Sequence, residues 1–435
     1  MNSQIKQRID QIRRGEVPEG YKKTKVGIVP EEWEITKLYL ISSHVSKKNT
    51  NGEVQTTFTN SATQGVIKQT DYFDKEISNK ENITSYYVVQ ENDYIYNPRI
   101  SVSAPCGPIN KSHFSENGIV SPLYTVFRLN DVFQQNKYIE FFFKSSFWHS
   151  YMCGIANYGA RHDRMNITNY DLFNMPIPFP PIAEQEKIAA ILQTEDKVIE
   201  LQQKKIDELK RLKKVYLSKM FPKKDCNVPE IRFPGFTEPW EQRKVSDVAE
   251  ICTGGTPSTG IEKYWYPKEI PWLSSGEVHK KYITYTDNKI SVEGMNNSSA
   301  RMIPENSVLI ALAGQGKTRG TVAINRIPLT TNQSIAAMAF SNEVVPEFVF
   351  CNLESRYEEI RRMSSGDGSR GGLNKQIIGE MEIPYTSKEE QTKIGAYFFN
   401  LDNLITLHQR KCDEEKQKKK ALMQLLLTGI VRTNK

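Results

Sequence analysis

The sequence predicts an α+β protein. Two globular domains of mixed α/β structure form a pseudo-two-fold repeat and are separated by two long, coiled-coil-like helices. Two observations support this prediction. A stretch of helical periodicity, too long to be buried inside one ordinary domain, occurs in the middle of the chain and again at its end. The residues that open the first globular segment also recur where the second segment opens. The repeat unit is therefore a globular segment followed by its helix.

The first long helix is expected to begin after Pro180 and Pro181, which suit the entrance of a helix but not its interior. About forty residues without glycine or proline follow, and their apolar side chains recur at steps of three, four and seven. At about 1.5 Å per residue, such a helix is about 60 Å long.

The second long helix repeats the first without a gap. Pro178 matches Pro384, 206 residues later, and at the same shift Glu-Gln at 184–185 falls on Glu-Gln at 390–391. Two amphipathic helices could share apolar positions by chance, but not also an Ile-Pro-aromatic entrance and a Glu-Gln-x-Lys-Ile motif. Thr-Ser at 386–387 replaces the two prolines, which leaves the start of the second helix less defined.

The globular segments repeat at their beginnings, where Trp33 corresponds to Trp240, 207 residues later. A charged N-terminal stretch ends near Gly15, and both a short arm that docks on the body and a disordered leader remain open. The predicted divisions are a helical arm (1–19), a first globular domain (20–181), a central long helix with a linker (182–231), a second globular domain (232–387) and a C-terminal long helix (388–435).

Within each globular segment, short β-branched and aromatic runs alternate with Asn, Gly, Ser and Thr, which is typical of strands and turns. In each half, one strand leads into a polar loop, at 97–107 and at 314–320. Strands are expected at 86–90, 94–96 and 123–129 in the first half and at 307–312, 321–324 and 334–340 in the second.

Between these framework positions the two halves diverge almost completely. A duplicated scaffold with two different loop sets fits two sites of different specificity. Drift after duplication is the alternative, and the sequence alone leaves it open.

Composition sets further bounds. The formal net charge of +7 allows a polyanionic partner without requiring one. No apolar run approaches the roughly 20 residues that span a membrane, and the first residues lack the apolar core of a signal peptide. Six scattered cysteines without a CxxC pair indicate reduced thiols, so a cytoplasmic protein is expected.

Residues 311–318, Ala-Leu-Ala-Gly-Gln-Gly-Lys-Thr, resemble a phosphate-binding loop in which alanine replaces the first glycine. The favoured interpretation is a basic, Gly-rich loop that reaches a backbone phosphate or a base edge. No hydrolase, metalloprotease or adenine-methyltransferase motif is present, so no catalytic residue is expected. His149 and Cys153, four residues apart, favour packing over metal binding, and no metal site is expected.

Polar residues of the Gly-, Ser- and Asn-rich loops are the candidates for contact with DNA. Arginine forms bidentate hydrogen bonds with guanine and with phosphate, although a single loop arginine is usually only solvated. The lysine-rich runs 210–214 and 416–420 lie in helices that also carry acidic residues, which favours a solvated helix face, with contact to the DNA backbone as the alternative. The candidates are Asn97, Arg99, Ser101, Ser103, Arg161, Gln315, Lys317, Thr318, Arg319 and Arg370.

A globular segment that opens near a tryptophan, continues into Ile-Pro-Phe-Pro-Pro-Ile-Ala-Glu-Gln-Glu-Lys-Ile at 177–188 and a long helix, and is then repeated, resembles the specificity subunit of type I restriction-modification systems. The resemblance covers nearly the whole chain. It implies that each globular segment is a target-recognition domain that reads one half of a bipartite target in double-stranded DNA. The long helices would lie antiparallel and set the distance between the half-sites.

The resemblance also implies the partners. The chain itself would carry no cofactor and make no covalent change. It would recruit two modification (methyltransferase) subunits, which carry S-adenosylmethionine, and restriction subunits, which use ATP and magnesium; no membrane contact is expected. The outer helix faces would remain for the methyltransferase subunits, while the inner apolar faces would meet in the pair. These inner residues are Ile188, Leu192, Ile199, Ile206, Leu209, Ile394, Phe398, Ile405, Leu422 and Leu426.

Two other hypotheses remain open. The paired helices could gather partner proteins as a scaffold that does not read DNA, although divergent loops have no purpose in a symmetric scaffold. An enzyme that hydrolyses nucleotides could use the loop at 311–318.

Overall fold

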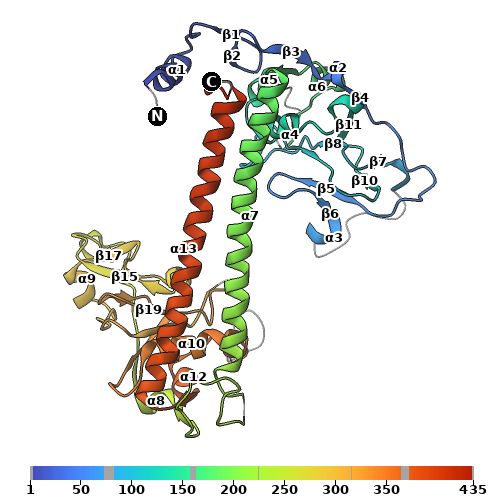
Figure 1. The fold of residues 1–435 in the computed structure, drawn as a ribbon. Coiled ribbons are helices and arrows are strands. Elements are labelled where there is room, and N and C mark those ends of the chain that lie inside the picture. Colours follow the sequence, from blue (N-terminus) through green and yellow to red (C-terminus); the bar gives the residue numbers. More distant parts are fainter. Residues whose placement is uncertain are drawn as a thin grey trace. The chain divides into compact units, whose positions relative to one another are not determined.

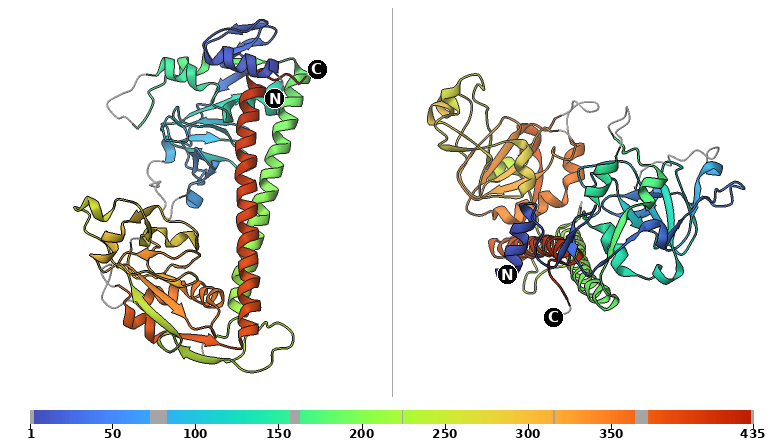
Figure 2. Two further views of the ribbon diagram at one scale, coloured as in Figure 1. Left: turned by 90° about the vertical axis from the view of Figure 1, so that its left-hand side faces the viewer. Right: turned by 90° about the horizontal axis from the view of Figure 1, so that it is seen from above.

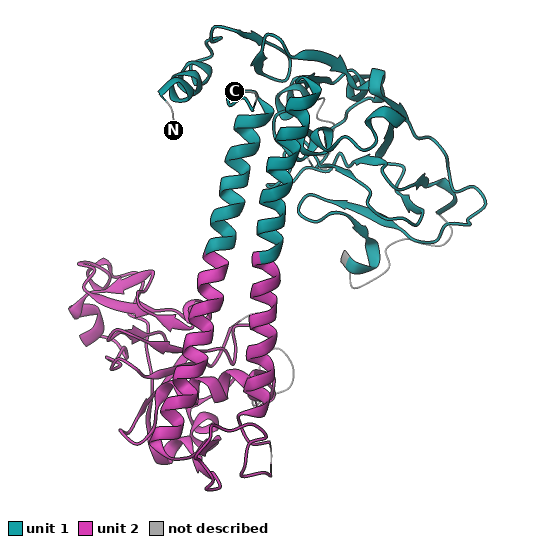
Figure 3. Ribbon diagram, viewed as in Figure 1, with its two compact units in different colours: residues 1–201, 411–435 teal, residues 202–410 magenta. Residues whose placement is uncertain are grey.

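The computed structural model describes residues 3–72, 83–156, 163–223, 225–314, 316–363 and 372–433. The chain divides into two compact units, shown in Figure 3: unit 1 comprises residues 1–201 and 411–435, and unit 2 comprises residues 202–410. Each unit contains one globular domain and one part of each long helix. The predicted α+β fold of two mixed domains and two long helices is confirmed.

The long helices are α7 (Ile182–Lys219) and α13 (Lys388–Leu427), drawn in green and red in Figure 1. Prolines 180 and 181 precede α7, as predicted. At the start of α13 a different device replaces them, because the Ser387 hydroxyl accepts a hydrogen bond from the Glu390 N–H at 3.3 Å. A serine cap of this kind satisfies one of the free N–H groups of the first turn.

Within each unit the two helices lie side by side (Figures 1 and 2). In unit 2, positions 202, 213 and 216 of α7 meet positions 408, 402 and 397 of α13 in that order, so the helices are antiparallel. This direction agrees with the prediction.

An ion pair between the helices occurs twice. In unit 1, Lys419 of α13 donates to Asp196 of α7. In unit 2, Lys213 of α7 donates to both carboxylate oxygens of Asp402 of α13, at 2.8 and 2.7 Å. Asp402 lies 206 residues after Asp196, and Lys213 lies 206 residues before Lys419. The two pairs are therefore copies of one contact, as a pseudo-two-fold repeat requires.

Unit 1 contains a four-stranded antiparallel sheet of order β4-β11-β8-β9, with three further strand pairs, and β12 pairs with β3. Its strands are β1 (Tyr21–Lys23), β2 (Ile28–Pro30), β3 (Glu34–Lys37), β4 (Ser42–His44), β5 (Phe58–Ser61), β6 (Gly65–Lys68), β7 (Tyr87–Val89), β8 (Tyr94–Tyr96), β9 (Ile109–Lys111), β10 (Gly118–Val120), β11 (Thr125–Leu129) and β12 (Pro176–Phe179). Its shorter helices are α1 (Ser3–Arg13), α2 (Leu38–Ile41), α3 (Gln69–Tyr72), α4 (Lys137–Lys144), α5 (His149–Ile155) and α6 (Asn169–Phe173).

Unit 2 contains a five-stranded sheet of order β14-β21-β18-β19-β16 and a three-stranded sheet of order β17-β15-β20. Its strands are β13 (Glu241–Lys244), β14 (Ala249–Thr253), β15 (Ile270–Leu273), β16 (Tyr282–Ile283), β17 (Asn288–Ile290), β18 (Val308–Ala311), β19 (Val322–Asn325), β20 (Thr330–Thr331), β21 (Ile335–Phe340) and β22 (Glu382–Tyr385). Its shorter helices are α8 (Val245–Val248), α9 (Val292–Asn296), α10 (Pro346–Ser355), α11 (Tyr357–Arg362) and α12 (Lys375–Glu380).

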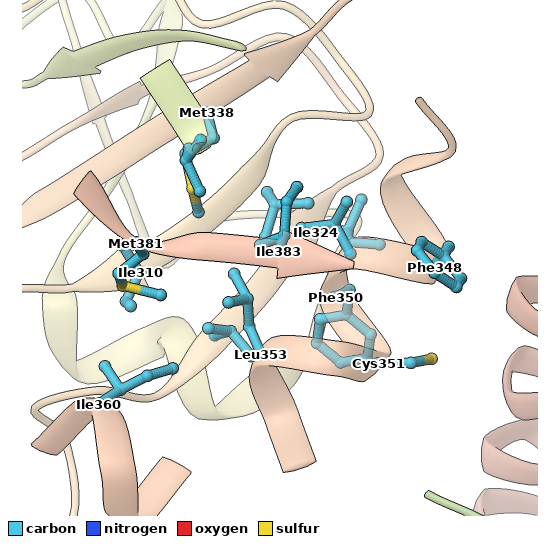
Figure 4. Packing of buried hydrophobic residues seen from close by; sticks show 14 of the residues in the cluster. Ile310, Ile324, Met338, Phe348, Phe350, Cys351, Leu353, Ile360, Met381 and Ile383 are labelled. Carbon is cyan, nitrogen blue, oxygen red and sulfur yellow. The ribbon is translucent and has the colours of Figure 1, made fainter. Parts of the chain in front are cut away.

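The six predicted strands are confirmed as β7, β8, β11, β18, β19 and β21, with ends that differ by no more than two residues. In unit 2 the sheet side chains pack against α10 and β22. Figure 4 shows this core, in which Ile310, Ile324 and Met338 of the sheet lie near Phe350 and Ile383. All five side chains are fully buried or nearly so.

Within each unit, the repeated sequence motifs pair with one another as strands. The Ile-Pro-aromatic residues, expected only as helix entrances, form β12 and β22. Each pairs with the strand that follows the repeated tryptophan: Pro178 lies opposite Ile35 in the β12–β3 pair, and Pro384 lies opposite Gln242 in the β22–β13 pair. In each globular domain the last strand thereby pairs with the strand after the tryptophan, directly before the long helix begins.

A buried glutamate fixes the start of α7. The indole N–H of Trp33 donates to Glu184 at 3.3 Å, and Arg432 donates to both oxygens of the same carboxylate at 2.8 and 2.7 Å. The Arg432 guanidinium also lies 6.0 Å from the Trp33 ring centre. Burial alone would raise the pKa of Glu184, but the hydrogen bonds and charge of Arg432 outweigh it and lower the pKa.

The same arrangement fixes the start of α13. Trp240 donates to Glu390 at 3.0 Å, and Arg232 donates to its two oxygens at 2.6 and 2.8 Å. The Arg232 guanidinium lies 5.9 Å from the Trp240 ring centre. Both glutamates are fully buried and lie in the first turn of a helix, where the helix dipole favours negative charge.

The glutamine that follows each glutamate ties the long helix to a shorter one. Gln185 accepts a hydrogen bond at 2.8 Å from Asn136, the N-cap residue of α4. Gln391 accepts one at 2.9 Å from the N–H of Val345, the N-cap residue of α10. The repeated Glu-Gln motif therefore joins three elements of each unit.

Apolar residues of the long helices belong to the cores of the globular domains. Ile188 and Leu192 pack in one cluster with Leu426 and the core of unit 1, and Ile394 and Phe398 pack in the core of unit 2. The predicted inner faces therefore meet the domains as well as each other. Of the ten predicted residues, Ile188, Leu192, Ile206, Leu209, Ile394, Phe398 and Leu426 are buried, and Ile199, Ile405 and Leu422 are half-buried.

The N-terminal arm docks within unit 1. Helix α1 places Arg8 so that it donates to the carbonyl of Ile430 at 3.1 Å, and the Tyr21 hydroxyl donates to the carbonyl of Gly429 at 2.8 Å. The first and last segments of the chain are thus joined by hydrogen bonds. Among the described residues, no helix has the length and apolar character that crossing a membrane requires.

Substituting Glu184 tests the contact at the start of α7. Glu184→Ala leaves the Trp33 N–H without its acceptor. It also removes the buried partner of the Arg432 guanidinium, which then keeps the exposed Glu32. We therefore expect the free energy of unfolding of unit 1 to fall by about 3 kcal/mol in urea denaturation. The matched control is Glu186→Ala, at an exposed position of the same helix, with an expected change within about 0.5 kcal/mol. Equal effects of the two variants would contradict the role of this glutamate.

The pH dependence gives this prediction a second readout. The pKa of Glu184 is lower in the folded chain, so its ionised form stabilises the fold above the unfolded pKa of about 4.3, and this contribution is lost as the pH falls through the folded pKa. The destabilisation caused by Glu184→Gln should therefore be complete at neutral pH and shrink below about pH 4.

Candidate functional site

Polar loops gather at one edge of the main sheet of unit 2. Strands β14 and β18 end at this edge and β21 begins there, since Thr253 lies opposite Ala336 and Ala311 lies opposite Ile335. Strand β19 also begins there. We call this surface the loop edge of unit 2. It comprises residues 254–259, 312–314, 316–321, 332–334 and 372–374.

Backbone hydrogen bonds hold these loops together. The N–H of Gly255 donates to Thr331 at 2.8 Å, that of Leu312 donates to Ser334 at 2.8 Å, and that of Leu373 donates to Leu312 at 3.1 Å. Gly254 must be glycine because a Cβ there would lie 2.0 Å from the carbonyl oxygen of Thr331. The loop edge is therefore built from segments that are far apart in the sequence.

Helix α11 holds the loop between β18 and β19 through hydrogen bonds to its backbone. The Tyr357 hydroxyl donates to the carbonyl of Lys317 at 3.0 Å, and Arg361 donates to the carbonyl of Gly316 at 3.0 Å. Gly316 has φ +61°, which favours glycine. The backbone is thereby fixed while the Lys317 side chain remains exposed, as suits contact with an anionic partner.

The resemblance of residues 311–318 to a phosphate-binding loop does not extend to their setting. A phosphate-binding loop leads from a strand into a helix, whose N-terminus attracts the phosphate. Here the loop joins β18 to its antiparallel neighbour β19. The structure therefore gives no support to the alternative of nucleotide hydrolysis.

Unit 1 has a loop edge at the equivalent place. Strands β4 and β8 end there and β11 and β9 begin there, since His44 lies opposite Phe127 and Tyr96 lies opposite both Thr125 and Ile109. The loop edge of unit 1 comprises residues 45–49, 97–108, 121–124 and 163–168.

The loop from 97 to 108 presents a tight polar turn. Ser101 and Ala104 exchange two backbone hydrogen bonds of 3.0 and 3.1 Å, and the hydroxyls of Ser101 and Ser103 lie 3.2 Å apart. Val102, between the serines, is completely exposed. Asn97 serves the loop itself, since it donates to the carbonyl of Asn60 at 3.0 Å and accepts from the N–H of Arg99 at 3.0 Å.

Two arginines meet at the base of this turn. Arg99 and Arg164 are bridge partners, because the N–H of Ile100 donates to Asp163 at 3.0 Å and that of Met165 donates to Pro98 at 3.0 Å. The Arg99 guanidinium lies 3.7 Å from the Asp163 carboxylate, but its side chain remains about two-thirds exposed. The Arg164 side chain is half-buried and lies 3.7 Å from the same carboxylate. An exposed and a half-buried guanidinium group at one loop edge suit phosphate or guanine.

The predicted site residues divide between the two loop edges. Arg99, Ser101 and Ser103 are exposed in unit 1, and Lys317 is exposed in unit 2. Thr318 and Arg319 are half-buried. The remaining candidates, Arg161, Gln315 and Arg370, lie outside the described residues.

Sequence reasoning missed several members of the loop edges. Arg164 carried no motif, and neither did Arg361, which supports the unit 2 loop edge from α11. Only the structure shows which loop each arginine contacts. Thr256 and Gln333, whose side chains share a 2.6 Å hydrogen bond, are both exposed in unit 2. The paired glycines at 254–255 were a usable signal, since adjacent glycines mark a close backbone approach. In the described part of the chain, no three His, Cys, Asp or Glu side chains are placed to hold a metal ion.

Comparison with known proteins identifies the repeated architecture. Residues 30–211 and 237–416 each match the type I restriction modification DNA specificity domain. The chain is 31% identical to the MjaIX specificity subunit of Methanocaldococcus jannaschii over 170 residues, which are 38% of each protein. It is 24% identical to the putative MjaX specificity subunit of the same organism, over 95% of this chain and 97% of that protein.

A solved structure shows the same fold. It comes from work on complex assembly and conformational transition of the type I R-M system. The TM-score is 0.57 at 16% identity, and the match covers 93% of this chain and 99% of that chain.

The contacts below the unit 2 loop can be tested without any ligand. Because Arg361→Ala removes the donor to Gly316, we expect faster amide hydrogen exchange over residues 316–321 by mass spectrometry. Arg362→Ala is the matched control, at the neighbouring exposed position of the same helix, and should leave exchange in the loop unchanged. Equal exchange in both variants would show that Arg361 does not hold the loop.

Proposed function

The chain belongs to the family of type I restriction modification DNA specificity domains, and we propose that each of its units reads one half of a bipartite target in double-stranded DNA. The observation that supports this proposal most is the pair of loop edges. In each unit the loop edge lies at the corresponding edge of the corresponding sheet, yet the two loop edges carry different side chains.

The chemistry of the loop edges suits such a role. Arg99 and Arg164 in unit 1 and Lys317 in unit 2 supply positive charge for phosphates, which positions a protein on the duplex. Ser101, Ser103 and other polar side chains at the same edges offer donors and acceptors to base edges. Different loops on equivalent frames imply half-sites of different sequence. A scaffold that does not read DNA would not need this difference.

The long helices would set the separation of the half-sites. Both α7 and α13 continue without interruption from one unit into the other. The repeated lysine–aspartate pair and the repeated buried glutamate fix each helix against its neighbours. Two linked readers bind with a high effective concentration for the second half-site, provided that the separation matches.

Two modification subunits would dock on equivalent outer helix surfaces. Leu201 of α7 is 56% exposed and Leu407 of α13, 206 residues later, is 47% exposed. One turn before each lies another apolar residue of the repeat, the half-buried Val198 and the exposed Leu404. Single exposed leucines are common, but a pair of apolar residues that recurs at repeat-related positions fits two identical partners.

The chemistry of the complex would reside in those partners. In this proposal the chain makes no covalent change and holds no cofactor. The modification subunits would carry S-adenosylmethionine, and the restriction subunits would use ATP and magnesium to cut unmodified DNA.

Exchange of one domain tests the reading of half-sites. Replacing residues 20–181 by the corresponding segment of another family member should change one half of the methylated target and leave the other half unaltered. Each wrong base pair costs about 1–3 kcal/mol, so the discarded half-site should lose methylation clearly. The measurement is methylation-sensitive sequencing of DNA from cells that also contain the modification subunit.

The matched control replaces residues 232–387, which should change only the opposite half-site. If either exchange altered both half-sites, or neither, independent reading by the two units would be disproved.

The docking surfaces make a separate prediction. Leu201→Asp and Leu407→Asp should each reduce the number of bound modification subunits from two to one in native mass spectrometry, because an aspartate would be buried without a partner. The double variant should bind none. Leu40→Asp, at another exposed leucine, should still bind two. Two bound subunits in every variant would place the docking surface elsewhere.

A further inference from the structure

Two thiols lie in contact beneath the loop edge of unit 1. The sulfur of Cys106, in the loop from 97 to 108, is 3.3 Å from the sulfur of Cys153 on α5. The other four cysteines have no such partner among the described residues, and all six are free thiols. A disulfide bond is about 2.05 Å long, so the sulfurs need to approach by only about 1.2 Å.

The pair occupies a structurally important position. In unit 2, α11 holds the equivalent loop through Tyr357 and Arg361. In unit 1, α5 follows α4 as α11 follows α10, and it reaches the loop through Cys153. The Cys106 thiol also donates to the carbonyl of His149, at the start of α5, at 3.6 Å. The thiol pair of unit 1 therefore occupies the position that corresponds to the hydrogen bonds between α11 and the loop in unit 2.

The surroundings of the loop end leave little freedom. The Tyr96 hydroxyl donates to the carbonyl of Cys106 at 3.1 Å. Gly107 has φ +75°, and a Cβ there would lie 2.1 Å from the carbonyl oxygen of Asn97. Cys106 is thus presented to Cys153 by a backbone that is held on both sides.

We propose that Cys106 and Cys153 form a site of reversible oxidation, at which a low-molecular-weight disulfide such as oxidised glutathione converts the two thiols into a disulfide that ties the loop from 97 to 108 to α5. The oxidation of these two thiols does not depend on the proposed function. Only the expected effect of oxidation on DNA binding rests on that function.

The two thiols have different accessibility, which sets the order of the reaction. Cys153 is exposed and Cys106 is buried. The Cys153 thiolate attacks one sulfur of oxidised glutathione, whose disulfide breaks and releases one glutathione thiolate. Cys106 then loses its proton to solvent and attacks the Cys153 sulfur, and the second glutathione leaves. Two protein thiols are oxidised, and one glutathione disulfide is reduced to two thiols.

Burial and the neighbouring sulfur also keep the Cys106 thiol unreactive until that first step. Burial, together with the hydrogen bond to Cys153, raises the pKa of the Cys106 thiol to about 12. Since the thiolate is the attacking form, Cys106 reacts only with a sulfur already placed beside it. The site therefore favours an internal disulfide over a glutathione adduct on Cys106.

Peptide mapping tests the site on the purified full-length chain. After incubation with oxidised glutathione, alkylation and digestion without reductant, we expect a peptide that links Cys106 to Cys153. Reduced glutathione should prevent it. The link should persist in Cys226→Ser, which removes an exposed cysteine of unit 2, and be absent in Cys153→Ser. A stable glutathione adduct on Cys153 with Cys106 still alkylated, or no linked peptide, would overturn the proposal.

Two further measurements test the consequence. Amide exchange over residues 99–108 should be slower in the oxidised wild type than in oxidised Cys153→Ser, because the link closes the loop onto α5. If unit 1 reads DNA as proposed, oxidation should weaken binding to the target several-fold in wild type and not in Cys153→Ser, since a fixed loop adjusts less to its partner. A linked peptide without slower amide exchange would disprove that the disulfide restrains the loop. Slower exchange without weaker DNA binding would disprove that the disulfide affects target recognition by unit 1.

Discussion

Each long helix begins with a glutamate that has no access to solvent, and the rest of the molecule is arranged around these two carboxylates. A buried carboxylate is costly unless every charge and hydrogen bond is matched. Here an indole N–H and a bidentate guanidinium match it in both units. The tryptophan directly precedes the strand that pairs with the last strand of the domain, and the glutamate follows that last strand. This contact therefore fixes where the domain ends and in which direction the helix leaves.

The repeat explains how one frame carries two different surfaces. The contacts that recur lie in the strand pairs, the Glu-Gln turns and the lysine–aspartate pairs between the helices. The loop edges do not recur: a serine turn and two arginines in one unit stand where a glycine-rich loop with an exposed lysine stands in the other. Buried, charge-matched contacts tolerate little change, whereas exposed loops can diverge freely.

The elements that sequence reasoning predicted are those with local signals. The periodicity of α7 and α13 and the apolar runs of β18 and β21 lie within single continuous stretches. The pairing of β3 with β12 was missed, because no local pattern states which strand will be the partner. Arg432 was missed for the same reason, since its glutamate lies 248 residues away. The candidate loops were found from composition, but Arg164 joined them only through the folded backbone.

The origin of the two arginines affects the order in which the protein can form. Arg232 lies within the continuous segment that makes up unit 2, whereas Arg432 lies near the end of the chain and completes unit 1. During synthesis, unit 2 has all its residues once position 410 has been made. Unit 1 must wait for residues 411–432, although its globular domain is made first. A ribosome that stalls between positions 410 and 432 would therefore hold a chain in which unit 2 has all its residues, whereas Glu184 of unit 1 still lacks its guanidinium partner.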